Sequence, residues 1–573
     1  MSDKSLNLIT RRSFLDLSVK SGLGVALSTL VDIPPFVRQA LAEGNIGLNG
    51  KKVLFIFLRG ANDALNSVIP VQDRAYYNMG TVASPDLTRP DIGIAKDTAA
   101  GANYDVSGRP CFDATLARDA AGTARLSTDP VYSYDKAISL GNGFAALHPS
   151  LKFLAPVYND GQLALIHRVG YPKQSRSHFD SQNFWENGAP FSNTVRDGVF
   201  YRAMVESGLA QTSPLTGVSV QRSLPMILRG SGAAMTNLTD TDRYSLLGVP
   251  GLSGAGKSAE FLKELNRLPY TPKREREMLH LQHENLSQTL SIFEDLRPGF
   301  NEAGNTFRDD GITDGDRDWY EANGNQGYYL FPTRDEINGG WVRPGAGAPK
   351  DAQKYVVPPG TTSEEFFTNL KAAALILNKT DAIVAGTQLD GFDTHSNQGG
   401  ATGSHANLQR RIGWAIYALR KYFTRYADRA QWKNVVVVTL TEFGRTTVQN
   451  SDEGTDHAEA GLMWVAGGSV SGYGQGRSGV FGCHPNDVVK WIPGPPNQTG
   501  IGDGSMFGVD NRYLKRAYDY RSVLGKIIRD HLGSTQAQLE RIIPGYTDKR
   551  EALAVGGTSQ LDGTPIMGEP AIL

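Results

Sequence analysis

The sequence predicts an α/β protein with a mainly parallel sheet. Four continuous apolar runs are typical of strands that are buried on both faces. Each of the three later runs follows a stretch with helical character, and this alternation predicts right-handed crossovers between parallel strands. The chain has 573 residues, which is compatible with one large domain that carries long insertions, as α/β enzymes often do.

The first strand is expected at Lys52–Leu58, between Asn49-Gly50 and Arg59-Gly60, because Gly and Asn interrupt regular structure on both sides. The remaining strands are expected at residues 163–166, 382–385 and 435–440. The helices that precede them are expected at residues 151–158, 364–377 and 408–426.

Two regions interrupt this alternation, near residues 78–145 and 210–360. The first, and the later part of the second, are rich in Gly, Asp, Thr and Pro and show little periodicity. We interpret both regions as surface insertions. Within the second, residues 273–296 carry apolar side chains at helical spacing and predict one long amphipathic helix. Residues 43–573 are therefore expected to form a single domain with insertions.

The N-terminus has the features of a twin-arginine (Tat) export signal. Arg11-Arg12 is followed by a mildly apolar stretch at Leu17–Val37 and by Ala40-Leu41-Ala42, a cleavage site for signal peptidase. Charged residues and two prolines interrupt the apolar stretch, so it is not expected to form a stable membrane span. We predict a signal peptide at 1–42, the Tat translocase as a partner, and a periplasmic or secreted mature protein. The alternative is an ordinary amphipathic N-terminal helix.

Charge and cysteine content narrow the possible partners. Lys and Arg number 58 against 59 Asp and Glu, which gives a net charge of -1. Without a long basic block, this balance gives no indication of a nucleic-acid partner. Cys111 and Cys483 are the only cysteines, and in an oxidising compartment they could form a disulfide, but the sequence leaves this open.

Polar side chains follow each of the four expected strands. In open parallel sheets, ligands bind beyond the carboxyl ends of the strands. Asp63 and Asn66 follow the first strand, Ser177, His178 and Asp180 the second, Asp393 and His395 the third, and Glu442, Arg445, Asp456 and His457 the fourth. Carboxylates and imidazoles that converge from several segments predict divalent metal binding, with Zn, Ca, Mg or Mn left open. Two such ions would clamp a displacement at phosphorus or sulfur, and Arg445 would hold a non-bridging oxygen.

Each of these residues also has a structural interpretation. An isolated Asp-x-His pair often forms an Asx turn with a surface histidine. Ser177 is a candidate nucleophile, but Ser177 or a neighbouring serine could instead cap a helix at residues 182–186. His405 is a possible further ligand, whereas His148 is expected to pack or to cap a helix.

Five motifs together resemble a known protein family. They are the sequences at residues 57–66 (FLRGANDALN), 176–180 (RSHFD), 392–395 (FDTH), 442–445 (EFGR) and 455–457 (TDH). As a set and in this order they resemble the Tat-exported bacterial proteins grouped as domain-of-unknown-function family 1501, and the resemblance covers about residues 51–532.

The resemblance implies the alkaline phosphatase and sulfatase superfamily, with a three-layer α/β/α sandwich and a metal-centred site. On this analogy Asp393 and His395 would bind one metal ion and Asp456 and His457 another, while Asp63 or Asn66 takes the place of the first-strand aspartate. The implied activity is hydrolysis of sulfate or phosphate esters of small molecules or polysaccharides, although fold-level analogy does not identify a substrate. The alternatives are a non-catalytic binding or assembly factor of the envelope and other metal chemistry, such as lyase or transferase action on carbohydrates.

Overall fold

The protein is described from a computed structural model. The structure describes residues 46–73, 75–76, 88–95, 137–192, 194–210, 215–231, 233, 235–240, 264, 289–290, 292–293, 295–296, 299–300, 307–309, 328–332, 361–474, 476–493, 506 and 513–573. The predicted signal peptide, most of the two predicted insertions, most of the predicted helix at 273–296, and Cys111 lie outside these residues. Any pairing of Cys111 with Cys483 therefore also lies outside the described residues.

Nine strands of the described chain form one large sheet. Its order is β15 (Val480–Phe481), β5 (Leu163–Gly170), β12 (Gly461–Gly467), β11 (Val435–Thr441), β1 (Lys52–Leu58), β10 (Val384–Leu389), β6 (Gly217–Val220) and β7 (Thr236–Leu238), and β16 (Tyr518–Asp519) also pairs with β5. The four strands expected from the apolar runs are thus confirmed as β1, β5, β10 and β11. Every residue of β1 is buried, because parallel neighbours flank it and helices cover both of its faces.

The sheet is mixed but mostly parallel. β10 and β11 pair with β1 in parallel register, whereas β12 lies antiparallel between β11 and β5. Two reversals restore the direction, so β5 runs the same way as β11 and β1. The carboxyl ends of β1, β5, β10 and β11 therefore meet at one edge, and the segment that enters β12 begins at that same edge.

The sequence interpretation missed several strands of this sheet. β6 and β7 fall within the region 210–360 that was expected to be an insertion, but they extend the sheet beyond β10. Residues 217–238 are thus part of the main fold. The strands β3 (Ile138–Ser139) and β4 (Ala145–Leu147), at the end of the other expected insertion, form a small antiparallel sheet with β2 (Val68–Pro70).

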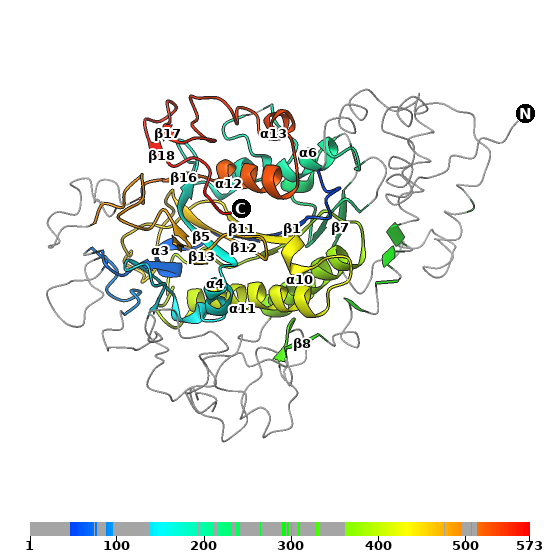
Figure 1. Ribbon diagram of the computed structural model, residues 1–573. Coiled ribbons are helices and arrows are strands. Elements are labelled where there is room, and N and C mark those ends of the chain that lie inside the picture. Colours follow the sequence, from blue (N-terminus) through cyan, green and yellow to red (C-terminus); the bar gives the residue numbers. More distant parts are fainter. Residues whose placement is uncertain are drawn as a thin grey trace, which may run out of the picture.

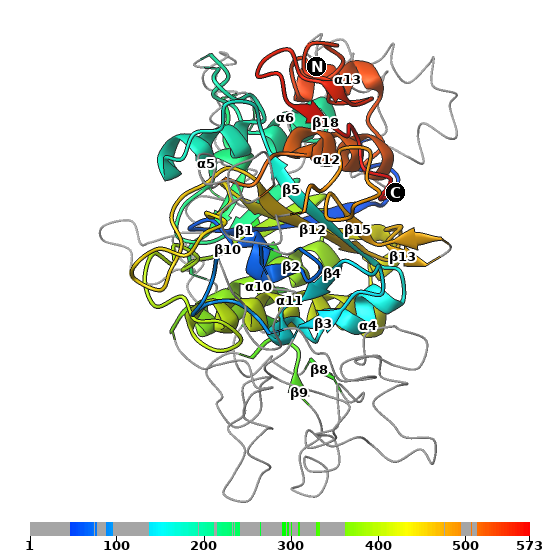
Figure 2. The ribbon, with the colours of Figure 1, turned by 90° about the vertical axis from the view of Figure 1, so that its left-hand side faces the viewer.

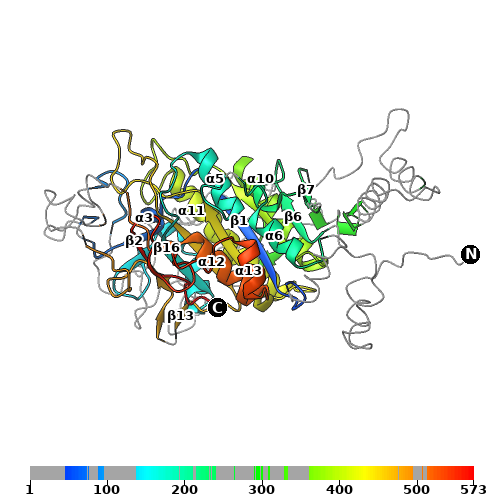
Figure 3. The same ribbon diagram turned by 90° about the horizontal axis from the view of Figure 1, so that it is seen from above.

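Helices pack against both faces of the large sheet. α4 (Leu154–Asn159), α10 (Thr361–Lys379) and α11 (Ser404–Arg425) cover one face, and α6 (Val199–Glu206), α12 (Tyr520–Lys526) and α13 (Gln536–Ile542) cover the other (Figure 1). Successive residues of β1 point to opposite faces of the sheet. Leu54 and Ile56 pack in the core beneath the first group of helices, and Val53 and Phe55 pack in the core beneath the second group. Figure 2 shows the sheet between these two groups, and Figure 3 looks onto the face covered by α6, α12 and α13.

Short elements complete the described chain. They are α3 (Ala64–Ser67), α5 (His178–Asn187), the 3-10 helices η2 (Pro149–Leu151), η3 (Met226–Leu228) and η5 (Trp432–Asn434), the π-helix η7 (Ile527–His531), and the strands β8 (Arg308–Asp309), β9 (Tyr328–Tyr329), β13 (Tyr473–Gly474), β14 (Arg477–Ser478), β17 (Gly557–Thr558) and β18 (Pro565–Ile566). Among the residues that the structure describes, no helix combines the length and apolar character needed to cross a bilayer.

Candidate metal centre

Three histidines and one aspartate converge at the carboxyl edge of the sheet. His178 begins α5, which follows β5, while Asp393 and His395 follow β10. His457 lies in the connection between β11 and the antiparallel strand β12, so it reaches the same edge from the opposite direction. The sheet topology thus gathers residues that lie up to 279 positions apart in the sequence.

The ring nitrogens and the carboxylate make direct contacts with one another. His457 Nε2 lies 3.0 Å from His178 Nε2, 2.9 Å from His395 Nε2 and 3.2 Å from Asp393 Oδ1. Asp393 also approaches His395 Nε2 at 3.1 Å, through Oδ1, and His178 Nε2 at 3.4 Å, through Oδ2. His178, Asp393 and His457 together have the spacing of a metal-binding group, and His395 adjoins two of them.

The outer nitrogen of each imidazole determines which tautomer is present. His457 Nδ1 lies 2.9 Å from the carbonyl oxygen of Arg176, which can only accept a hydrogen bond. His178 Nδ1 faces a Glu442 oxygen at 2.8 Å, and His395 Nδ1 faces an Asp456 oxygen at 3.2 Å. Each Nδ1 therefore donates its hydrogen outward, so the neutral ring presents an Nε2 lone pair to the centre.

This arrangement matches the geometry that a small cation requires. Metal-bound histidines usually donate their second nitrogen to a carboxylate or a backbone carbonyl, as all three rings do here. With metal–nitrogen bonds of about 2.0–2.1 Å, tetrahedral ligand atoms lie about 3.3 Å apart. The separations of 3.0–3.4 Å among His178, Asp393 and His457 are close to that value, and His395 adjoins this group at 2.9 Å from His457 and 3.1 Å from Asp393.

Three nitrogen lone pairs and a carboxylate cannot face one another without a positive charge between them. A divalent cation supplies that charge, and in its absence an extra proton on one ring can do so. The centre is accessible to solvent, since the Asp393 side chain is 43% exposed and that of His178 is 24% exposed. An imidazole-rich set with one carboxylate suits Zn²⁺ and similar transition-metal ions better than Ca²⁺ or Mg²⁺.

Glu442 orients His178 from beneath the site. It is fully buried at the end of β11, where one oxygen accepts from His178, from Gln182 Nε2 at 3.1 Å and from the Gly60 backbone at 2.8 Å. Burial raises the pKa of Glu442, but these hydrogen bonds lower it further than burial raises it. The hydrogen bond to Glu442 in turn raises the pKa of His178, against the smaller opposing effect of burial. Glu442 therefore stays ionised and fixes the ring orientation.

Arg445 holds Asp393 rather than facing solvent. Its Nη1 donates to Asp393 Oδ1 at 2.6 Å, its Nε donates to Thr455 Oγ1 at 3.2 Å, and its Nη2 donates to the Thr455 carbonyl. Burial raises the pKa of Asp393, but the contact with His457 and the hydrogen bond from Arg445 lower it well below its usual range. With all three of its nitrogens bonded within the protein and its side chain buried, Arg445 positions a carboxylate instead of offering a free fork to a substrate.

The other predicted site residues occupy the surroundings. Asp456 bonds the outer nitrogen of His395 and accepts from Asn450 Nδ2 at 3.1 Å, so it supports a ligand. Ser177 caps α5 by accepting from the Asp180 backbone, and Asp180 is exposed in the first turn of that helix. The geometry therefore shows one contiguous cluster of four residues, and the assignment of two metal ions to the Asp/His pairs stays a prediction of the resemblance.

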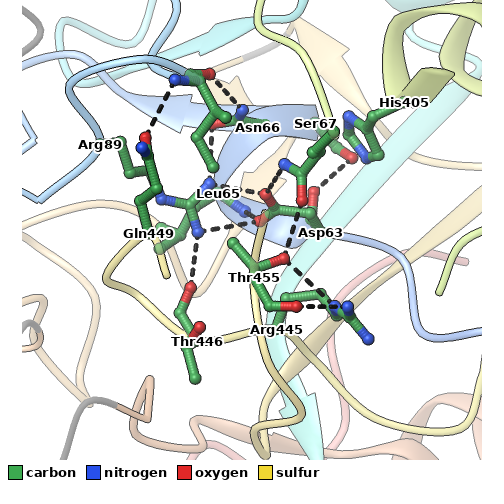
Figure 4. Close-up of polar contacts among 12 residues, drawn as sticks. Asp63, Leu65, Asn66, Ser67, Arg89, His405, Arg445, Thr446, Gln449 and Thr455 are labelled. Atoms are coloured by element: carbon green, nitrogen blue, oxygen red, sulfur yellow. Dashed lines mark hydrogen bonds and ion pairs between the residues drawn. The ribbon is translucent and has the colours of Figure 1, made fainter. Parts of the chain in front are cut away.

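The structure does not bring Asp63 or Asn66 to the cluster. Asp63 is buried behind it, where both carboxylate oxygens accept from Arg89, at 2.6 and 3.2 Å (Figure 4). Asn66 joins the same network by accepting from Arg89 at 2.8 Å. Nothing in the local sequence around Arg89 predicts this partnership, because Arg89 lies within the expected insertion at 78–145.

His405 and His148 also lie apart from the cluster. His405 is buried against Asn62 and Gln409, and burial lowers its pKa to about 4. His148 caps η2 by accepting from the Ser150 backbone, as its position before a helix predicts.

The fold and the site together define the class: an α/β protein whose mostly parallel sheet carries a histidine–carboxylate cluster at its carboxyl edge. Residues 347–485 match the sequence model of a family described as "Protein of unknown function (DUF1501)". The matched residues include Asp393, His395 and His457, while His178 lies outside them. No curated protein and no solved structure matches the chain.

Proposed function

We propose that this protein is an exported, metal-dependent hydrolase of phosphate or sulfate esters. One observation carries the proposal: the Nε2 atoms of His178 and His395 and the Asp393 carboxylate all lie within 3.2 Å of His457 Nε2, and each ring is fixed through its other nitrogen. The ester class and the three-layer sandwich of the alkaline phosphatase type follow from the resemblance of the motifs, and export follows from the N-terminal signal.

The described residues would divide the work as follows. His178, Asp393, His395 and His457 would bind the cation, which when bound supplies Lewis acidity and lowers the pKa of coordinated water. Glu442 holds the His178 ring, and Arg445 keeps the Asp393 carboxylate ionised and in place. The exposed side of the cluster is where an ester would enter.

Metal analysis and turnover of the purified mature protein test the proposal. We expect about one bound cation per chain, and hydrolysis of an aryl phosphate or aryl sulfate that a chelator abolishes and added metal restores. His457→Ala should lose the metal. His484→Ala is the matched control, because the His484 ring contacts Asn142 and Asn486 instead. A wild-type protein that binds no cation would overturn the proposal.

Two contacts favour a second candidate, a non-catalytic binding or assembly factor of the cell envelope. The Arg445 side chain is fully buried against Asp393 and Thr455, out of reach of a substrate oxygen, and the Ser177 hydroxyl is engaged as a helix cap. This alternative predicts bound metal without turnover. It also predicts that the double variant Asp456→Ala, His457→Ala restores the phenotype of a deletion strain as well as the wild-type protein does. The hydrolase proposal predicts that this variant fails to restore it.

A further inference from the structure

A buried polar network lies directly behind the cluster. Asp63, Arg89 and Gln398 are its centre, and their side chains are at most 1% exposed. Arg89 forms the two-pronged ion pair with Asp63, and Gln398 Nε2 donates to the same carboxylate at 2.7 Å. A buried carboxylate with these partners remains charged.

Gln398 connects the two loops that carry three of the candidate ligands. Its Oε1 accepts from Thr394 Oγ1 and from Thr455 Oγ1, both at 2.8 Å. Thr394 lies between Asp393 and His395, and Thr455 lies two residues before His457. The Thr455 backbone also donates to the Thr394 carbonyl at 3.1 Å, so the two loops lie side by side here. The side-chain amide of Gln398 bonds both threonine hydroxyls and thereby sets the spacing of the two loops.

The charge of Asp63 decides which way that amide points. An ionised carboxylate only accepts hydrogen bonds, so Gln398 must turn its NH₂ group toward Asp63 and its oxygen toward the two threonine hydroxyls. Without the charge, the opposite orientation becomes available, and both threonine hydroxyls would then face a donor.

Arg89 also holds the backbone segment that follows Arg445. Its remaining donors bond the carbonyls of Thr446 at 2.7 Å and Thr447 at 3.0 Å. These residues directly follow Arg445, which holds Asp393. The buried network therefore fixes the loop that carries Asp393 and His395 and the segment that carries Arg445 and His457.

We propose that Asp63 is a positioning residue and not a metal ligand: through Gln398 it fixes the spacing of the loops that present Asp393, His395 and His457. The inference rests on the metal centre proposed above. It predicts that changes in the network weaken metal binding although every ligand remains.

Gln398→Met tests this directly, because methionine has a similar length but makes none of the three hydrogen bonds. Zn²⁺ affinity is measured on the full-length mature chain by competition with a chromophoric chelator, and Co²⁺ absorption reports the geometry of the ligands. We expect the Kd for Zn²⁺ to rise by about 10- to 100-fold, as changes around metal ligands typically cause, together with an altered Co²⁺ spectrum. Thr394→Val removes a single hydrogen bond and should show a smaller change in the same direction.

The control is another buried amide with a similar number of hydrogen bonds. Asn378 near the end of α10 bonds the Tyr422 hydroxyl, the Tyr426 carbonyl and the Asp428 backbone, and it precedes β10, at the other end of that strand from the site. Asn378→Leu should lower the melting temperature and leave the Kd for Zn²⁺ unchanged.

The outcomes separate the two proposals. If wild-type protein binds no Zn²⁺ or Co²⁺, the metal centre itself fails. If wild type binds and the folded Gln398→Met and Thr394→Val variants bind equally well with the same Co²⁺ spectrum, only the positioning role is overturned. Should Gln398→Met fail to fold, Thr394→Val decides the question.

Discussion

Asp63→Asn probes the buried ion pair behind the site, and its effect on stability follows from the structure. Burial raises the pKa of Asp63, but the charge of Arg89 and the hydrogen bonds from Arg89 and Gln398 lower it from 3.8 to about 2. A folded-state pKa below the unfolded value stabilises the protein above the unfolded pKa, and this contribution is lost as the pH falls through the folded pKa. A lowering of this size corresponds to a stabilisation of about 2–3 kcal/mol above the unfolded pKa.

The substitution is expected to remove more than this amount at pH 7. Asparagine leaves the Arg89 guanidinium buried without a counter-charge, and breaking a buried pair in this way costs about 3–5 kcal/mol. Urea unfolding of the metal-free protein, followed by the fluorescence of buried tryptophans such as Trp185 and Trp464, measures the free energy of unfolding. The difference between wild type and variant should shrink by about 2 kcal/mol as the pH falls from 5 to 2, where the Asp63 carboxyl of the folded protein is about half protonated.

The result that would refute this reasoning is equal stability of the two proteins at pH 7, or a difference that does not change between pH 5 and pH 2. Asp548→Asn serves as the control, because Asp548 pairs with Arg550 on the surface. Solvent screens such exposed pairs, so this variant should match wild type throughout the titration.

Three further predictions concern the cluster itself. His457→Ala removes the ring that contacts all three other candidate ligands, so isothermal titration with Zn²⁺ should show no saturable site, and retained affinity would contradict the assignment. Glu442→Gln removes the charge that fixes the His178 tautomer, and equilibrium dialysis should show affinity weakened by about 10- to 100-fold; an unchanged Kd would exclude this role. Gly60→Ala places a Cβ 2.3 Å from the Asp393 backbone nitrogen and should abolish metal binding. The control is Gly50→Ala, which is also at positive φ but has no atom within 4 Å of the added Cβ, and it should only lower stability by about 1 kcal/mol. Equal metal binding by the two variants would show that close packing at Gly60 is unimportant.

The apolar runs were sufficient to locate the central strands. Lys52–Leu58 and Val435–Thr441 are buried along their whole length, and such strands leave a continuous hydrophobic signal in the sequence. Gly461–Gly467 has the same apolar character, but it is the antiparallel strand that a strict alternation of helix and strand does not anticipate. β6 and β7 are only 4 and 3 residues long, too short to stand out within a region dominated by loop residues.

For the site, the amino-acid sequence was sufficient to identify the polar side chains that follow the buried strands. His178, Asp393, His395 and His457 could be predicted in this way, because the alternation of helices and buried strands indicates parallel strands whose carboxyl ends share one edge. The packing of the folded chain determines that these four residues meet, that Arg445 and Asp456 support them, and that Asp63 pairs with Arg89. The reason is physical: the partner of a buried charge is set by how distant loops pack, and no local pattern in the sequence records that packing.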